Sequence, residues 1–127
     1  MPLKYKLVHK PHPTKPEEPK KIYAKAVHDN IIDIRTLAKE ISTISTISPA
    51  DTAAMIESLI QIIPDHVING DIVSLGDFGT FALNIKSDGA ESEKAFLPSK
   101  IKGVKLLFRP GKVLKQMIRT VTFQKVS

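Results

Sequence analysis

One glycine-bracketed segment, residues 73–81 (VSLGDFGTF), limits what this chain can fold into more than any other feature. Apolar and β-branched residues run into a Gly-Asp-Phe-Gly sequence in which two glycines enclose one aromatic residue. This pattern predicts a strand, a tight reversal that needs positive φ angles, and a second strand. We expect Phe78 to anchor the bend.

A second informative segment, residues 108–114 (FRPGKVL), lies further along the chain. Phe108 ends another apolar strand, and Pro110 occupies a first helical turn, where a missing N–H is tolerated. A short basic helix is predicted from Pro110 to about residue 118, with Lys112 and Lys115 about one turn apart. The charged, turn-rich span between the two segments cannot be buried, so we expect an arm that projects from a compact body.

Two amphipathic helices are predicted before these segments. Asp33 can cap the first, which the β-branched and polar residues that follow should end near Thr46. The second begins at Pro49 and ends at Gly70. Pro64 lies inside its apolar pattern, where it removes a backbone donor, so we expect a kink or a restart of the helix there.

Alternating apolar residues predict three strands near the chain ends, at residues 3–8, 22–27 and 121–126. Four prolines in residues 11–19 exclude a helix between the first two strands and favour an extended linker. The strand at 121–126 could pair with either of the other two. These segments therefore predict a small accessory sheet whose strand order is open.

The two glycine-containing segments together resemble the HU/IHF family of bacterial nucleoid proteins, whose members carry a GFGxF turn and an F-[KR]-P-G-K-x-L junction. Here the turn is residues 76–81 (GDFGTF), with one residue inserted, and the junction is residues 108–114. The extended ends are similar to a divergent HU-like branch with extra terminal strands. The resemblance implies an α+β fold, namely an HU/IHF-like intertwined dimer with a helical base, β-sheet arms and accessory terminal β-strands.

This resemblance also suggests how the chain is divided. Residues 1–32 would form an N-terminal extension of strands and a proline-rich linker, residues 33–118 an HU-like DNA-binding domain, and residues 119–127 a C-terminal strand. Two amphipathic helices and one bent sheet offer more apolar surface than a monomer of this size can cover. We therefore expect a two-fold homodimer, with a heterodimer as the alternative.

The charge is basic overall, with a net +6, which raises nucleic acid or an anionic membrane as partners. It is also polarised, because residues 33–70 hold five acidic and two basic side chains, whereas residues 111–127 hold four basic and no acidic ones. Phosphate neutralisation by such a basic region supplies most non-specific DNA affinity. The predicted DNA-binding residues in the arm and the junction are Lys86, Lys94, Lys100, Lys102, Lys105, Arg109, Gly111, Lys112, Lys115 and Arg119. Gly111 is included because a helix opening presents free N–H groups to a phosphate.

The arm departs from the family pattern. Family arms are rich in arginine and end in Arg-Asn-Pro, which bends DNA by inserting an apolar wedge in the minor groove. Residues 85–103 contain no Arg-Asn-Pro and have a net charge of about +1, a weak phosphate clamp. Phe96, Leu97 and Pro98 form the only apolar cluster there that could act as a wedge. The alternative is that Phe96 and Leu97 pack against the body.

Other function classes have little support in the sequence. The absence of cysteine excludes disulfides and thiolate sites. His9 and His12 have no nearby carboxylate that would complete a metal site, and His28 and His66 are isolated histidines. No catalytic elbow or phosphate-binding loop is present, so we expect no enzyme, no cofactor and no small-molecule substrate. No apolar run is long enough to span a membrane, which predicts a cytoplasmic protein of the nucleoid.

These observations predict an architectural protein that binds double-stranded DNA with low sequence specificity and bends or compacts it. The alternative keeps the HU fold as a protein–protein assembly module, with DNA binding weak or lost. In this alternative, the acidic residues of the arm and the extra terminal strands would serve protein–protein assembly. Salt-sensitive binding to a duplex would separate the two.

Overall fold

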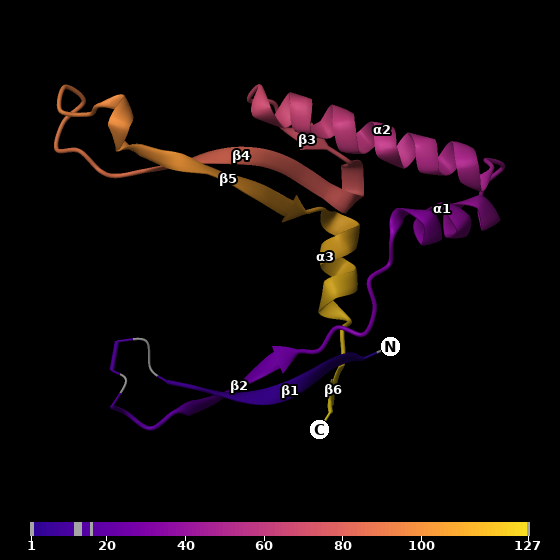
Figure 1. The fold of residues 1–127 in the computed structure, drawn as a ribbon, viewed down its shortest axis with the longest axis horizontal. Coiled ribbons are helices and arrows are strands. Elements are labelled where there is room, and N and C mark those ends of the chain that lie inside the picture. The colour runs from indigo at the N-terminus through magenta and orange to yellow at the C-terminus, as the bar shows by residue number, and fades with distance from the viewer. Residues whose placement is uncertain (1, 12–13, 16, 127) are drawn as a thin grey trace. The chain divides into compact units, whose positions relative to one another are not determined.

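The computed structural model describes residues 2–11, 14–15 and 17–126, which divide into two compact units. The central unit is Ile32–Gln116, and the terminal unit combines Met1–Ile31 with Met117–Ser127. Each unit holds one three-stranded sheet, and the helices α1 and α2 belong to the central unit (Figure 1). Part of the predicted proline-rich linker, residues 12–13 and 16, lies outside the described residues.

The central unit begins with the helix α1 (Ile34–Thr43), which ends before the position predicted from the sequence. At its start, the Thr36 backbone N–H donates to the carboxylate of Asp33 at 2.9 Å, which lowers the pKa of that carboxyl and confirms the predicted cap. At its end, the hydroxyls of Ser42 and Thr43 donate to backbone carbonyls of the helix. Such local bonds compete with helix continuation and explain the earlier stop.

The second helix, α2 (Pro49–Ile68), has the predicted start and end. Pro49 occupies the first turn, and Gly70 follows the helix with a φ of 93°. The predicted restart at Pro64 is wrong, because the helix is continuous through that residue. Val67, one turn further on, is buried, so packing of the last turn offsets the hydrogen bond that the proline cannot donate.

The sheet of the central unit consists of β3 (Val73–Ser74), β4 (Gly79–Ser87) and β5 (Ile101–Pro110), all antiparallel in that order. A 3-10 turn, η1 (Gly76–Phe78), makes the predicted reversal, and Gly76 and Gly79 have φ angles of 60° and 149°. The ribbon of β4 and β5 extends past the end of α2 as the predicted arm (Figure 1). A second 3-10 turn, η2 (Pro98–Lys100), leads back into β5.

Phe78 is less buried than its predicted role as an anchor requires. Its ring contacts that of Phe108 at a centroid distance of 5.4 Å, yet 51% of the residue is exposed. Phe108 packs more closely on Phe81, at 4.9 Å. The aromatic cluster therefore centres on Phe108, and Phe78 covers one side of it.

The strand-to-helix junction leads into α3 (Lys112–Arg119), which begins two residues later than predicted because Pro110 still belongs to β5. Gly111 lies between the two elements, and its N–H donates to the Phe78 carbonyl at 2.8 Å. This N–H is therefore not free for a phosphate, and that part of the prediction is wrong. The bond instead ties the junction to the η1 turn.

Replacing Gly111 with alanine is expected to destabilise the protein strongly, because the added Cβ would lie 3.0 Å from the Asp77 Cα and closer still to its carbonyl group. Overpacking against backbone atoms of this kind costs about 2 to 3 kcal/mol. The measurement is the urea midpoint of unfolding. Gly89→Ala is the matched control, since nothing lies within 4 Å of its Cβ position. Equal midpoints for the two variants would contradict this account of the junction.

The central unit leaves most of its apolar surface open. In the described part of the chain, only Ala38, Thr52, Val67 and Gly79 are buried. A groove of about 500 Å³ runs between α2 and the β4–β5 ribbon. We call it the apolar groove, and it is lined by Ile56, Leu59, Ile60, Ile63, Pro64, Val67, Ile68, Phe81, Leu83 and Leu106. A protomer with so few buried residues lacks a sufficient core of its own.

The terminal unit contains the predicted accessory sheet, with strand order β2-β1-β6. The strands β1 (Leu3–Lys10) and β2 (Lys21–Ala26) form an antiparallel pair. The strand β6 (Phe123–Lys125) adds to the other edge of β1 and runs parallel to it. The structure thus selects β1 as the partner that the sequence left open.

Candidate nucleic-acid interface

The β4–β5 ribbon has one apolar and one polar face. The pairs Phe81–Phe108 and Leu83–Leu106 lie in register, and Phe81, Leu83 and Leu106 line the apolar groove against α2. Successive side chains of a strand point to opposite faces, so the intervening pairs project the other way. This mainly polar face, called the polar face below, carries the pairs Thr80–Arg109 and Asn84–Lys105, with Lys86 opposite Gly103. The apolar pair Ala82–Leu107 lies between the two polar pairs.

The cationic side chains of the polar face are available to bind an anion. Lys105 and Arg109 are exposed and lie four residues apart on β5, a separation of roughly 13 Å. Among the residues that the structure describes, neither they nor Lys86 form an ion pair. A hollow of about 140 Å³ on this face is lined by Thr80, Asn84 and Arg109 together with the apolar residues Ile72, Ala82 and Leu107. Its polar side chains are of the kinds that hydrogen-bond to phosphates.

One of the predicted cations, Lys102, forms an ion pair with a carboxylate of the arm. The register of β4 and β5 shifts between Lys86 and Ser87, and the resulting bulge leaves Lys102 without a strand partner. The Lys102 Nζ then lies 3.2 Å from Asp88 Oδ2 in an exposed ion pair. Such a surface pair contributes little stability, so a phosphate can compete for this lysine, but the carboxylate stays close to it.

The other two arm lysines differ in their surroundings. The backbone of Lys100 closes the arm, because its N–H donates to the Leu97 carbonyl and its carbonyl accepts the Asp88 N–H, both at 2.8 Å. Its side chain is therefore presented from a fixed turn. Lys94 lies in the outer loop and is exposed. The two lysines are not brought onto the polar face by the strand register.

The proposed wedge residues lie at the turn before β5. Phe96 is 39% exposed and Leu97 is 57% exposed, and Pro98 starts the η2 turn. Phe96 is the more covered of the two apolar side chains, and neither is buried in the protomer, so packing of both against the body stays the alternative. Insertion between base pairs stays a prediction.

The start of α3 departs from the usual charge pattern of a helix. Its first turn contains no acidic residue, and Lys112 occupies the first position, at the positive end of the helix dipole. Lys115 and Arg119 follow at intervals of three and four residues, which places all three on one side of the helix. A cation at this end is unfavourable for the helix alone, and a departure of this kind often marks a functional position.

Sequence reasoning did not identify Thr80 and Asn84 as part of this surface. Thr80 and Asn84 flank the apolar run of Phe81, Ala82 and Leu83, so the strict polar–apolar alternation that would have marked them as one face is broken at Ala82. Their pairing with Arg109 and Lys105 was not visible, since it depends on the register of β4 and β5. The register is what brings the polar and basic residues onto one face.

The described part of the chain holds no group of three or more histidine, cysteine, aspartate or glutamate side chains that could bind a metal. None of its helices is both long and apolar enough to cross a membrane.

Comparison with known proteins relates the chain to HU domains. Residues 1–125 match a family model described as an HU domain fused to a wHTH, Ig or glycine-rich motif. A solved structure from Bacteroides vulgatus, described as a candidate bacterial DNA-binding protein, matches with a TM-score of 0.64 and 16% identity. The match covers 98% of this chain and 48% of the other, so this chain spans about half that protein's length. No curated protein matches the chain in sequence.

Proposed function

The chain belongs to the family of HU domains fused to wHTH, Ig or glycine-rich motifs, and on this premise we propose that it is an architectural protein of the nucleoid. It binds duplex DNA through the phosphate backbone with low sequence specificity. Its role is binding and bending, without a catalytic step or a cofactor. The solved structure of similar fold is described as a candidate DNA-binding protein, which supports DNA as the ligand in this proposal.

The observation that carries this proposal is the placement of the basic residues. Lys86, Lys105 and Arg109 share the face of the β4–β5 ribbon that is turned away from the apolar groove. The next residues along the chain, through Gly111, lead directly into α3, where Lys112 and Lys115 add two exposed cations. Phosphate contacts from such a surface supply affinity without reading base edges.

The functional form in this proposal is a homodimer. The apolar groove and the large exposed apolar residues of α2 need a partner surface, and a second copy offers the same surface by two-fold symmetry. A dimer would present two arms and two basic junctions to one duplex. Phe96 and Leu97 on each arm would then be the side chains that enter the minor groove and bend the DNA.

The assembly alternative has one observation in its favour. The Lys102–Asp88 ion pair and the nearby acidic residues Glu91 and Glu93 leave the arm with little free positive charge. An arm of this composition suits a protein partner better than a phosphate clamp. In that case, DNA affinity would be weak, and it would not depend on the basic junction.

The first test is the affinity for a fluorescent duplex of about 30 bp, titrated across salt concentrations. If at least four phosphates are neutralised, the slope of log affinity against log salt is about −3.6 or steeper. Two unrelated sequences should give the same slope and similar affinities. Undetectable binding at low salt would overturn the proposed function and leave the assembly alternative.

A further inference from the structure

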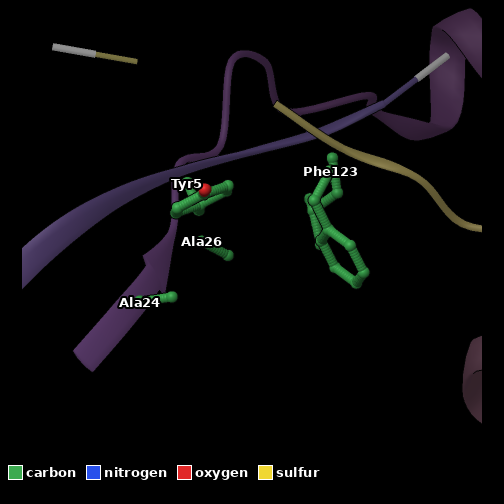
Figure 2. Close-up of a pocket in the computed structure, with 5 residues that line it drawn as sticks. Tyr5, Ala24, Ala26 and Phe123 are labelled. Atoms are coloured by element: carbon green, nitrogen blue, oxygen red, sulfur yellow. The ribbon is translucent and has the colours of Figure 1, made fainter. Parts of the chain in front are cut away.

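The β2-β1-β6 sheet of the terminal unit also has two unlike faces. Leu3, Tyr5, Ala24, Ala26 and Phe123 line a hollow of about 470 Å³ on one of them. Figure 2 shows the labelled residues Tyr5, Ala24, Ala26 and Phe123 around this hollow, contributed by all three strands. The residues that alternate with them along β1 and β2 project from the opposite face.

That opposite face is dominated by lysine, and we call it the lysine face. The register pairs Lys6 with Lys25 and Lys10 with Lys21, and Val8 with Tyr23 lies between the two lysine pairs. Lys4 adds a fifth ammonium group at one end. The lysine face thus consists of Lys4, Lys6, Val8, Lys10, Lys21, Tyr23 and Lys25.

The positive charge of this face is almost uncompensated. Lys4 lies 3.4 Å from Asp29, in an exposed ion pair. Across the ranges that the structure describes, Lys6, Lys10, Lys21 and Lys25 form no ion pair, and all four are exposed. Like charges directly opposite one another on antiparallel strands are destabilising. The sheet holds two such pairs, and an anionic ligand would relieve the electrostatic repulsion within them.

We propose that the lysine face is a second surface for the phosphates of duplex DNA, separate from the β4–β5 ribbon and α3. Lysines two and four residues apart on β1 repeat at roughly 7 and 13 Å, which presents a row of charges to a polyanion. The Tyr23 hydroxyl adds a further donor of the kind that contacts phosphates, and Tyr23 is 46% exposed. This inference rests on the proposed function in one respect, namely that the protein binds DNA.

A nucleic acid fits this face better than an anionic membrane does. Membrane-surface binding needs apolar side chains on the same side as the cations. Here Leu3 and Phe123 lie on the opposite face, around the hollow. The lysine face offers only Val8 and the partly exposed Tyr23 between its charges.

The test compares two full-length variants on the same duplex of about 30 bp. In the first, Lys6→Gln, Lys10→Gln, Lys21→Gln and Lys25→Gln neutralise the lysine face. The salt slope should become shallower by about one unit for each lysine that contacts a phosphate, at least about three units in all. The second variant reverses the charges of the junction, Lys112→Glu with Lys115→Glu, and leaves the lysine face intact.

The controls separate charge from folding. Lys39→Gln with Lys125→Gln neutralises two exposed lysines outside both surfaces, and this variant should keep the slope of the unaltered protein. Lys6→Arg with Lys25→Arg retains the charge and should also keep it, whereas Lys6→Gln with Lys25→Gln should not. Because neutralisation removes two like-charge pairs, the thermal midpoint of the quadruple variant should be unchanged or higher.

The outcomes distinguish this inference from the proposed function. An unchanged slope in the quadruple variant, with loss of binding in the junction variant, would overturn the inference alone. Loss only in the quadruple variant would support the inference and overturn the role of the junction. Binding to vesicles of phosphatidylcholine and phosphatidylserine that requires the four lysines, with an unchanged DNA slope, would overturn DNA as the ligand of this face.

Discussion

Reversing the charge at Lys112 and Lys115 to glutamate is expected to lower the affinity for a duplex of about 30 bp by roughly a thousandfold at low salt. A dimer would lose four phosphate contacts, each of which contributes on the order of 1 kcal/mol. Both side chains are exposed, so the substitution removes no packing. Fluorescence anisotropy with the labelled duplex measures the loss.

The same substitution should leave the fold intact or slightly more stable. Lys112 stands at the positive end of the α3 dipole, where a carboxylate is favoured over an ammonium group. A matched control, Arg35→Glu with Lys39→Glu, makes the same change of charge at two exposed positions of α1. If this control weakened DNA binding as much as the junction variant, the effect would reflect net charge and not a basic surface at the junction.

Replacing Ile60 with aspartate is expected to separate the subunits and unfold the protein at room temperature. Ile60 lines the apolar groove, so in a dimer its carboxylate replacement would be buried without a partner. Burial of an unpaired charge costs several kcal/mol, about 4 kcal/mol or more per protomer. Only a few residues are buried in the single protomer, so little stability remains once the partner is lost. Sedimentation equilibrium and circular dichroism measure the mass and the helical content.

The chain offers a close control for this substitution on the same helix. Ile62 is 54% exposed in the protomer, similar to Ile60 at 51%, but it does not line the apolar groove. Ile62→Asp should therefore keep the dimer and most of the helical signal. Equal disruption by both substitutions would show that the groove is not the surface that holds two copies together.

The elements of this fold could be read from local patterns, because their signals are short in range. Asp33 and Pro49 mark helix starts through hydrogen bonds and backbone angles set within one turn. The glycines of the β3–β4 reversal mark positive φ angles that few other residues adopt. The effect of Pro64 could not be read in this way, since the burial of Val67 after it depends on tertiary packing.

The candidate site was less predictable, because it depends on strand register. Arg109 and Lys105 could be chosen for their charge, but their placement beside Thr80 and Asn84 follows from pairing across the ribbon. Lys102 could not be told apart from its neighbours until the bulge placed it beside Asp88. The role of Gly111 was misread for a similar reason, since its N–H partner, the Phe78 carbonyl, lies in a segment remote in sequence.

The parallel pairing of β6 with β1 determines when the terminal sheet can form during protein synthesis. Leu3 is in register with Phe123, and the Leu3 N–H donates to the Thr122 carbonyl at 2.8 Å, so this edge of the sheet joins two segments that lie far apart in sequence. The β1–β2 hairpin is local and can form early, whereas closing a loop this long is slow and costs chain entropy. During synthesis on the ribosome, the open edge of β1 must wait until β6 has emerged. The terminal sheet is therefore expected to be completed only after translation has passed residue 125.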